Sequence, residues 1–152
     1  MSRRRLPARG GAQGFTLVEL LVVVAIVGIL AAIGFALYVN VLARGRMGRA
    51  TADVKTISSA LGAYAAHMGA IPTTAEGLTV LAQASTNAQG QTAGPFLSVV
   101  PAPPTGGNPA WPSVYVYRAD TAPGGGGAQG RFVVCATGDG FVAHSSGSST
   151  CP

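Results

Sequence analysis

Residues 14–43 read GFTLVELLVVVAIVGILAAIGFALYVNVLA, and Glu19 is the one charged side chain in this apolar stretch. A helix rises about 1.5 Å per residue, so about 20 apolar residues cross the roughly 30 Å hydrocarbon core of a membrane. The uncharged residues 20–43 are therefore long enough to span a bilayer. A cleaved secretory signal usually has a shorter apolar region, of about 7–15 residues. Ala32-Ile33-Gly34 nevertheless offers the small residues that a signal peptidase reads, and a conventional signal peptide is the alternative.

Glu19 is the feature of this stretch that a simple membrane anchor does not explain. A carboxylate near the centre of a membrane-spanning helix costs about 2.5 kcal/mol or more, and acidic residues in such segments usually have a partner. A free amino terminus on a neighbouring copy of the chain would supply the positive charge. Cleavage after Gly14 would create such a terminus at Phe15, four residues before Glu19.

The charge of the chain is low and unevenly placed. Only 10% of the 152 residues are charged, against roughly 25% in a typical soluble domain. Four arginines stand in the first nine residues, and from residue 15 onward six positive side chains face five acidic ones. A nucleic-acid-binding domain would carry a basic face, so we expect no nucleic-acid partner. A second basic cluster directly follows the apolar stretch, and we expect it to face lipid head groups; it consists of Arg44, Arg46 and Arg49.

An arginine-rich leader, then GFTLVEL at residues 14–20, then an unbroken apolar stretch resembles the class III signal of type IV pilins and type II secretion pseudopilins. The resemblance implies that a prepilin peptidase cuts between Gly14 and Phe15 and N-methylates Phe15. It also implies that Glu19 neutralises the amino terminus of an adjacent subunit during assembly. The expected parts are a cleaved leader at residues 1–14, the transmembrane and assembly half of a long helix at residues 15–43, and a periplasmic globular domain at residues 44–152.

Beyond the apolar stretch, apolar side chains recur at steps of three and four residues, which is the spacing of one helical stripe. The stripe consists of Met47, Ala50, Val54, Ile57, Leu61, Tyr64 and Met68. Together with the apolar stretch, it predicts one helix from about Phe15 to His67. Gly69 is a suitable C-terminal cap, and Pro72 prevents continuation.

A short helix is expected next. Thr73 and Glu76 have the spacing of a capping box, in which each side chain accepts a hydrogen bond from the backbone of the other residue. Leu78 and Leu81 would give this helix its apolar face. The stretch IPTTAEGLTVL, residues 71–81, also resembles a segment of the major pseudopilin of type II secretion.

The rest of the chain predicts a long connection and a small sheet. Residues 83–112 are rich in small and polar residues, and we expect Phe96-Leu97 and Val99-Val100 to anchor them. Strand-like segments occupy residues 113–118, 131–136 and 141–144, the last two separated by the hairpin signal Gly138-Asp139-Gly140. The glycine-rich residues 124–130 should form a loop. The predicted fold class is α+β, a long N-terminal helix packed on a small antiparallel sheet, as in pilins.

The leader arginines favour a cytoplasmic N-terminus, so we expect a single-pass protein of the bacterial inner membrane with its C-terminal domain in the periplasm. Cys135 and Cys151 both lie in the exported part. An even number of cysteines in an oxidising compartment predicts one disulfide, with two unpaired buried thiols as the alternative.

Nothing in the sequence indicates catalysis, and we expect neither an enzyme nor a cofactor. The glycines at residues 124–127 lack the Lys-Ser or Lys-Thr of a phosphate-binding loop, and His67 and His144 lack metal-ligand spacing. In the family, major pseudopilins hold calcium with acidic residues of the C-terminal loops. Here only Asp120 and Asp139 follow residue 76, whereas calcium takes six or more oxygen ligands. We therefore expect no bound metal.

The expected function is that of a structural subunit, a pseudopilin that polymerises into a short filament serving type II protein secretion. Its implied partners are other copies of itself, the prepilin peptidase and N-methyltransferase, minor pseudopilins or minor pilins, and an inner-membrane assembly platform. A type IV pilin of a surface fibre, for adhesion, motility or DNA uptake, is the first alternative, and a C-terminal disulfide loop favours it. A signal-anchored periplasmic binding domain that does not polymerise is the second.

Overall fold

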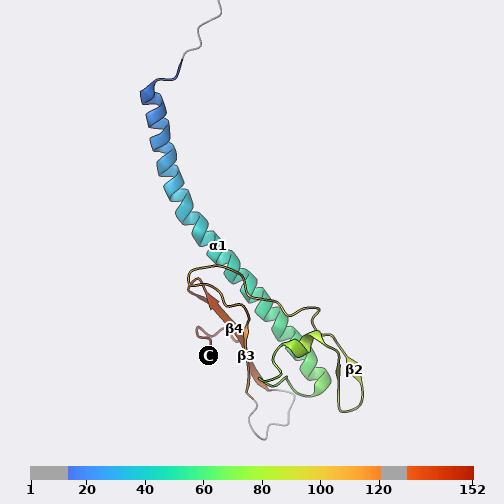
Figure 1. Ribbon diagram of the computed structural model, residues 1–152. Coiled ribbons are helices and arrows are strands. Elements are labelled where there is room, and N and C mark those ends of the chain that lie inside the picture. Colours follow the sequence, from blue (N-terminus) through green and yellow to red (C-terminus); the bar gives the residue numbers. More distant parts are fainter. Residues whose placement is uncertain (1–13, 121–129) are drawn as a thin grey trace, which may run out of the picture. The chain divides into compact units, whose positions relative to one another are not determined.

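The computed structural model describes residues 14–120 and 130–152 (Figure 1). The leader arginines and the glycines at 124–127 lie outside the described residues. The elements in chain order are the helix α1, Leu17–Met68; the 3₁₀ helix η1, Thr79–Ala82; and the strands β1, Ser85–Thr86; β2, Thr92–Ala93; β3, Val116–Asp120; β4, Arg131–Gly138; and β5, Phe141–His144. The chain divides into an N-terminal unit that ends at Asn40 and a C-terminal unit, Val41–Pro152.

The N-terminal unit contains the apolar part of α1. The Thr16 hydroxyl accepts a hydrogen bond from the backbone N–H of Glu19 at 3.2 Å, which satisfies one of the free donors at the start of the helix. Every side chain described between residues 15 and 42 is exposed. The most apolar 18-residue window of α1 has a mean hydropathy of 3.0. This part of the helix is therefore long and apolar enough to cross a membrane.

The second half of α1 belongs to the C-terminal unit and presents the predicted stripe to a core. Met47 and Met68, at the ends of the stripe, are partly buried, and the five residues between them are buried. The helix ends as predicted, because Gly69 takes a φ of 81° and its N–H donates to the Ala65 carbonyl at 2.8 Å. A left-handed glycine in this position is a common helix C-cap.

Three antiparallel strands in the order β3-β4-β5 form the main sheet. Val116 pairs with Cys135, and Cys135 pairs with His144. Asp139 and Gly140 have φ of 53° and 77° and connect β4 to β5, as expected of a two-residue turn that needs positive φ at both positions. The second and third predicted strands are confirmed, and the first begins three residues later than predicted.

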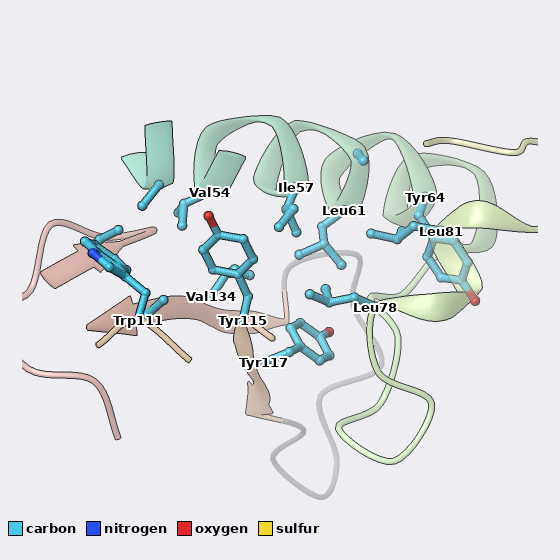
Figure 2. Close-up of a cluster of buried hydrophobic side chains, with 14 residues drawn as sticks. Val54, Ile57, Leu61, Tyr64, Leu78, Leu81, Trp111, Tyr115, Tyr117 and Val134 are labelled. Carbon is cyan, nitrogen blue, oxygen red and sulfur yellow. The ribbon is translucent and has the colours of Figure 1, made fainter. Parts of the chain in front are cut away.

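The core lies between α1 and this sheet (Figure 2). Successive side chains of a strand point to opposite faces, so Val134 and Ala136 of β4 face the helix and Cys135 faces away. Val134, Ile57 and Leu61 have no exposed surface. The α+β class is thus confirmed.

The capping box forms in a different setting from the one predicted. The Thr73 N–H donates to the Glu76 carboxylate at 2.7 Å, and the Glu76 N–H donates to the Thr73 hydroxyl at 3.2 Å. These bonds close a turn that ends at Gly77, whose φ is 66°, and the short helix η1 begins only at Thr79. Both bonds are local, so they stabilise a turn as readily as a helix start.

The segment 83–112 is partly different from the expectation. It contains a two-stranded hairpin, β1 with β2, that the sequence analysis missed. Val99 was expected to be an anchor, but its side chain is 74% exposed. The other three expected anchors, Phe96, Leu97 and Val100, pack on the core. The N–H groups of Phe96 and Leu97 also both donate to the Leu81 carbonyl at 2.9 Å.

Candidate functional site

The predicted cleavage site stands just before the helix. Gly14 and Phe15 are not helical, and the Phe15 side chain is 84% exposed. A peptide bond outside regular structure is accessible to a peptidase, whereas one inside the helix is not. The geometry is compatible with cleavage between these residues, which stays a prediction, as does methylation of Phe15.

Glu19 lies in the first turn of α1, one turn after Phe15. A negative charge at this end of a helix is favourable, because the free N–H groups give the N-terminus a partial positive charge. Among the described residues, none forms a hydrogen bond or ion pair with the Glu19 carboxylate. Apolar side chains surround its turn of the helix, among them Leu17, Leu20 and Leu21. The carboxylate is therefore the single charged group that this apolar surface offers to another molecule.

The structure joins Cys135 and Cys151 in a disulfide with a Cα–Cα distance of 5.8 Å. Cys135 lies at the centre of β4, on the face turned away from α1, and is nevertheless fully buried. The tail after β5 is also tied to β4, because Ser145 exchanges two hydrogen bonds with the Val134 backbone, at 2.9 and 3.1 Å. Hydrogen bonds and the disulfide together fix the C-terminal tail to the outer face of the sheet.

A cluster of polar contacts gathers around Asp139 in the turn between β4 and β5. Its carboxylate accepts hydrogen bonds from Arg46 Nε at 2.6 Å, Arg46 Nη2 at 3.0 Å, Trp111 Nε1 at 2.9 Å and the Asn108 N–H at 3.0 Å. We call Arg46, Asn108, Trp111 and Asp139 the Asp139 cluster. The Arg46 guanidinium, followed by the Trp111 indole, holds the pKa of Asp139 well below its usual range.

The basic residues that follow the apolar stretch were expected to face lipid head groups together, and for Arg46 the Asp139 cluster contradicts this expectation. Arg46 turns toward Asp139, and its side chain is only 23% exposed. Arg44 is exposed. The Arg49 side chain is 67% exposed, and its Nε lies 3.9 Å from Asp53 Oδ2. The role of Arg46 could not be predicted from the sequence, because its partner Asp139 is 93 residues away and no local spacing connects the two.

Comparison with known families identifies the C-terminal part of the chain. The family described as "Type II secretion system (T2SS), protein G" matches residues 38–148, well over half of the chain. The chain belongs to this family. A second model, the prokaryotic N-terminal methylation motif, matches residues 9–35. The predicted resemblance to type II secretion pseudopilins is confirmed. The family is one of structural, pilin-like subunits.

Several curated relatives of this T2SS protein G family member are fimbrial proteins. Fimbrial protein EcpB of Eikenella corrodens is 43% identical over 61 residues, 40% of this chain and 38% of the relative. A fimbrial protein of Pseudomonas aeruginosa is 48% identical over 48 residues, and the type IV major fimbrial protein FimA of Dichelobacter nodosus is 45% identical over 49. The chain thus spans less than two fifths of the length of these relatives. No solved structure matches the protein.

The residues of this family member do not fit the calcium site that its resemblance to major pseudopilins implies. Asp139 has its carboxylate engaged by Arg46, Trp111 and Asn108. The Asp120 side chain is outside what the structure describes. Within residues 14–120 and 130–152, no three His, Cys, Asp or Glu side chains are grouped so that they would hold a metal ion.

The two histidines have structural contacts. His67 Nε2 is 3.1 Å from the carbonyl oxygens of Ser85 and Gln91; since both partners are acceptors, this nitrogen carries the hydrogen. It ties the β1–β2 hairpin to the end of α1. His144 Nδ1 accepts a hydrogen bond from the Ser146 N–H at 3.1 Å, so it stabilises the start of the C-terminal tail.

Two buried tyrosines, Tyr115 directly before β3 and Tyr117 within it, link this part of the chain to α1 and to the turn that follows α1, and the sequence alone did not predict either contact. The Tyr115 hydroxyl donates to the Asp53 carboxylate at 3.0 Å, and the Tyr117 hydroxyl donates to the Pro72 carbonyl at 2.6 Å. Burial raises the pKa of Tyr117 to about 12, and burial with the neighbouring Asp53 carboxylate also raises the pKa of Tyr115. Both phenols remain neutral donors at physiological pH.

Proposed function

We propose that the protein is a pseudopilin, a filament subunit of a type II protein secretion system. It is processed between Gly14 and Phe15, N-methylated at Phe15 and anchored by residues 15–43 in the inner membrane, with residues 44–152 in the periplasm. The observation that supports this best is the match of two adjacent family models, at residues 9–35 and 38–148. The exposed apolar half of α1 and the compact C-terminal unit agree with such a subunit.

The chemistry of assembly follows from the charges at the start of α1. Processing leaves an ammonium group on Phe15, and filament packing would bury it among apolar helices together with Glu19. Leaving one buried charge without its partner costs several kcal/mol. The ammonium of an incoming subunit therefore docks against the Glu19 carboxylate of its neighbour, and this pairing also sets the axial register of the two helices.

Replacement of Glu19 tests this proposal. Glu19→Ala removes the carboxylate and makes the helix more apolar, so we expect normal cleavage and membrane insertion but no filaments. The matched control is Lys55→Ala, which removes a charged side chain from an exposed position of α1 outside the apolar stretch and should assemble normally. The readout is cross-linking and recovery of assembled subunits, with the processed band followed on the same gel. Assembly of Glu19→Ala at wild-type yield would show that the role assigned to Glu19 is wrong.

Prepilin peptidase, minor pseudopilins and an inner-membrane assembly platform are the partners that this function requires. Deleting the gene tests the secretion role directly. We expect exported proteins to accumulate in the periplasm while surface fibres are unaffected. A non-polymerising binding domain would instead leave secretion intact and be insensitive to Glu19→Ala.

A type IV pilin of a surface fibre is the second candidate. The fimbrial relatives and the disulfide-closed C-terminal tail favour it. On this alternative, shearing intact cells releases filaments that contain the protein, and the gene deletion removes surface fibres while secretion continues. The two outcomes of the deletion experiment are therefore opposite for the two candidates.

A further inference from the structure

The Asp139 cluster joins three segments that are distant in the sequence: α1 through Arg46, the loop before β3 through Asn108 and Trp111, and the β4–β5 turn through Asp139 itself. Backbone contacts reinforce it. The Asp139 N–H donates to the Pro109 carbonyl at 2.8 Å, and the Trp111 N–H donates to the Gly106 carbonyl at 3.1 Å. The carboxylate is thus the common fastening point of the loops on this part of the C-terminal unit.

The acceptor capacity of the Asp139 carboxylate is fully used. A carboxylate offers about four lone-pair positions. Oδ1 accepts from Arg46 Nη2 and the Asn108 N–H, and Oδ2 accepts from Arg46 Nε and Trp111 Nε1. The Asp139 side chain is only 6% exposed. A metal ion would have to displace one of these donors and would meet the positive charge of Arg46.

The backbone around the carboxylate is built closely for this arrangement. A Cβ at Gly107 would lie 2.8 Å from Asp139 Oδ1, and a Cβ at Gly138 would lie 2.4 Å from the Trp111 ring. Both glycines leave space that the carboxylate and the indole occupy. The donors are therefore held in place by packing on several sides.

We infer that Arg46 is the built-in cation of the Asp139 cluster, so that the C-terminal unit is held together without a bound divalent metal ion. The guanidinium satisfies two lone pairs with a planar fork and supplies the positive charge at the same site. Calcium would instead require six to eight oxygen ligands. This inference concerns the fold of the C-terminal unit, goes beyond the proposed function, and holds whichever filament the subunit enters.

Thermal unfolding of the full chain in detergent micelles tests the metal independence. Trp111 is the single tryptophan of the protein and part of the cluster, so its fluorescence reports directly on this site. We expect the same unfolding midpoint in millimolar calcium chloride and in EDTA. A bound ion at about 100 times its dissociation constant would raise the midpoint by about 10 °C. Such a rise in calcium would overturn the inference.

Substitution of Arg46 tests its role as the cation. Arg46→Met removes the charge and keeps the aliphatic stem, and we expect it to lower the midpoint by about 5–10 °C or to prevent folding. The control Arg49→Met removes a neighbouring exposed arginine and should unfold within about 2 °C of the wild type. Arg46→Lys, which retains charge without the planar fork, should fall between them. Equal midpoints for Arg46→Met and Arg49→Met would refute the assignment.

Discussion

Three carboxylates of this protein have three different environments. Glu76 accepts hydrogen bonds from the Thr73 backbone and hydroxyl, which lower its pKa. Asp139 is nearly buried and has all of its acceptor positions occupied inside the chain. Glu19 stands exposed among apolar side chains with no partner among the described residues. The first two carboxylates serve the fold of the C-terminal unit, whereas the third is the one for which we propose an interaction between subunits.

The depressed pKa of Asp139 predicts a loss of stability in acid. The unfolded carboxyl takes up a proton near its ordinary pKa of about 4, well above the pKa that it has in the folded state. The unfolded chain therefore binds more protons below this pH, and the contribution of Asp139, complete above about pH 5, falls as the pH drops. We expect the unfolding midpoint of the wild type to fall more steeply between about pH 6 and pH 3 than that of Asp139→Asn. Parallel pH profiles for the two proteins would contradict this.

A side chain at position 138 should disturb the Asp139 cluster sterically. A Cβ at this position would meet the Trp111 ring at 2.4 Å, so Gly138→Ala must displace the indole from Asp139. We expect a loss of about 1–3 kcal/mol in the free energy of unfolding, together with a shift in Trp111 emission. The control is Gly62→Ala, at an open helical position, which should stabilise the protein by about 0.5–1 kcal/mol. The same effect from both substitutions would disprove the steric argument.

At the scale of the elements, α1 combines two surfaces in one helix. Up to Leu42 its described side chains are exposed and, apart from Glu19 and Asn40, apolar, and from Ala50 to Tyr64 a single stripe is buried against the sheet. The first pattern suits lipid or neighbouring helices on all sides, whereas the second suits a partner on one side only. The change in pattern therefore marks where the helix passes from a fully exposed apolar surface to contacts within the C-terminal unit.

We expect the Cys135–Cys151 disulfide to stabilise the sheet and the C-terminal tail. Closing a loop of about 15 residues contributes roughly 3 kcal/mol in the chain-entropy model. We expect the double variant Cys135→Ala with Cys151→Ala to lose about that free energy of unfolding, and a reductant to have the same effect on the wild type but none on the variant. Non-reducing peptide mapping of exported protein checks the pair itself. Quantitative alkylation of both thiols without reductant would rule it out.

The elements that the sequence predicts well are those with a local or periodic signal. The stripe from Met47 to Met68 and the turn at Gly138-Asp139-Gly140 predict α1 and the β4–β5 hairpin closely. The contacts that the sequence does not predict join residues that are distant along the chain. Arg46 contacts Asp139, and Tyr115 contacts Asp53, only because the fold brings α1 beside the sheet. The Thr73 capping box shows a related limit, because its local bonds form equally well in a turn.

At the scale of the whole molecule, the two units have complementary properties. The C-terminal unit satisfies its own buried polar groups, since no buried side-chain nitrogen or oxygen in the described part of the chain lacks a hydrogen-bond partner. Within the described residues the N-terminal unit buries none of its apolar surface, because every side chain described up to Asn40 is exposed. A protein built in this way needs a membrane or other subunits around its N-terminal unit, which is the requirement that a pilin-like subunit meets.

Processing is the prediction that involves the whole chain. Because Gly14 and Phe15 precede the helix and Glu19 follows one turn later, we expect the mature protein to begin at N-methyl-Phe15. The apolar half of α1 stays attached, so the mature protein should remain in the membrane fraction. Intact-mass analysis of the membrane-extracted protein measures the terminus and the methyl group together, and the Glu19→Ala protein serves as a control that should be cut at the same bond. A terminus at Phe35, as a conventional signal peptidase would leave, or an uncut Met1 would contradict both the cleavage site and the amino terminus that Glu19 is proposed to neutralise.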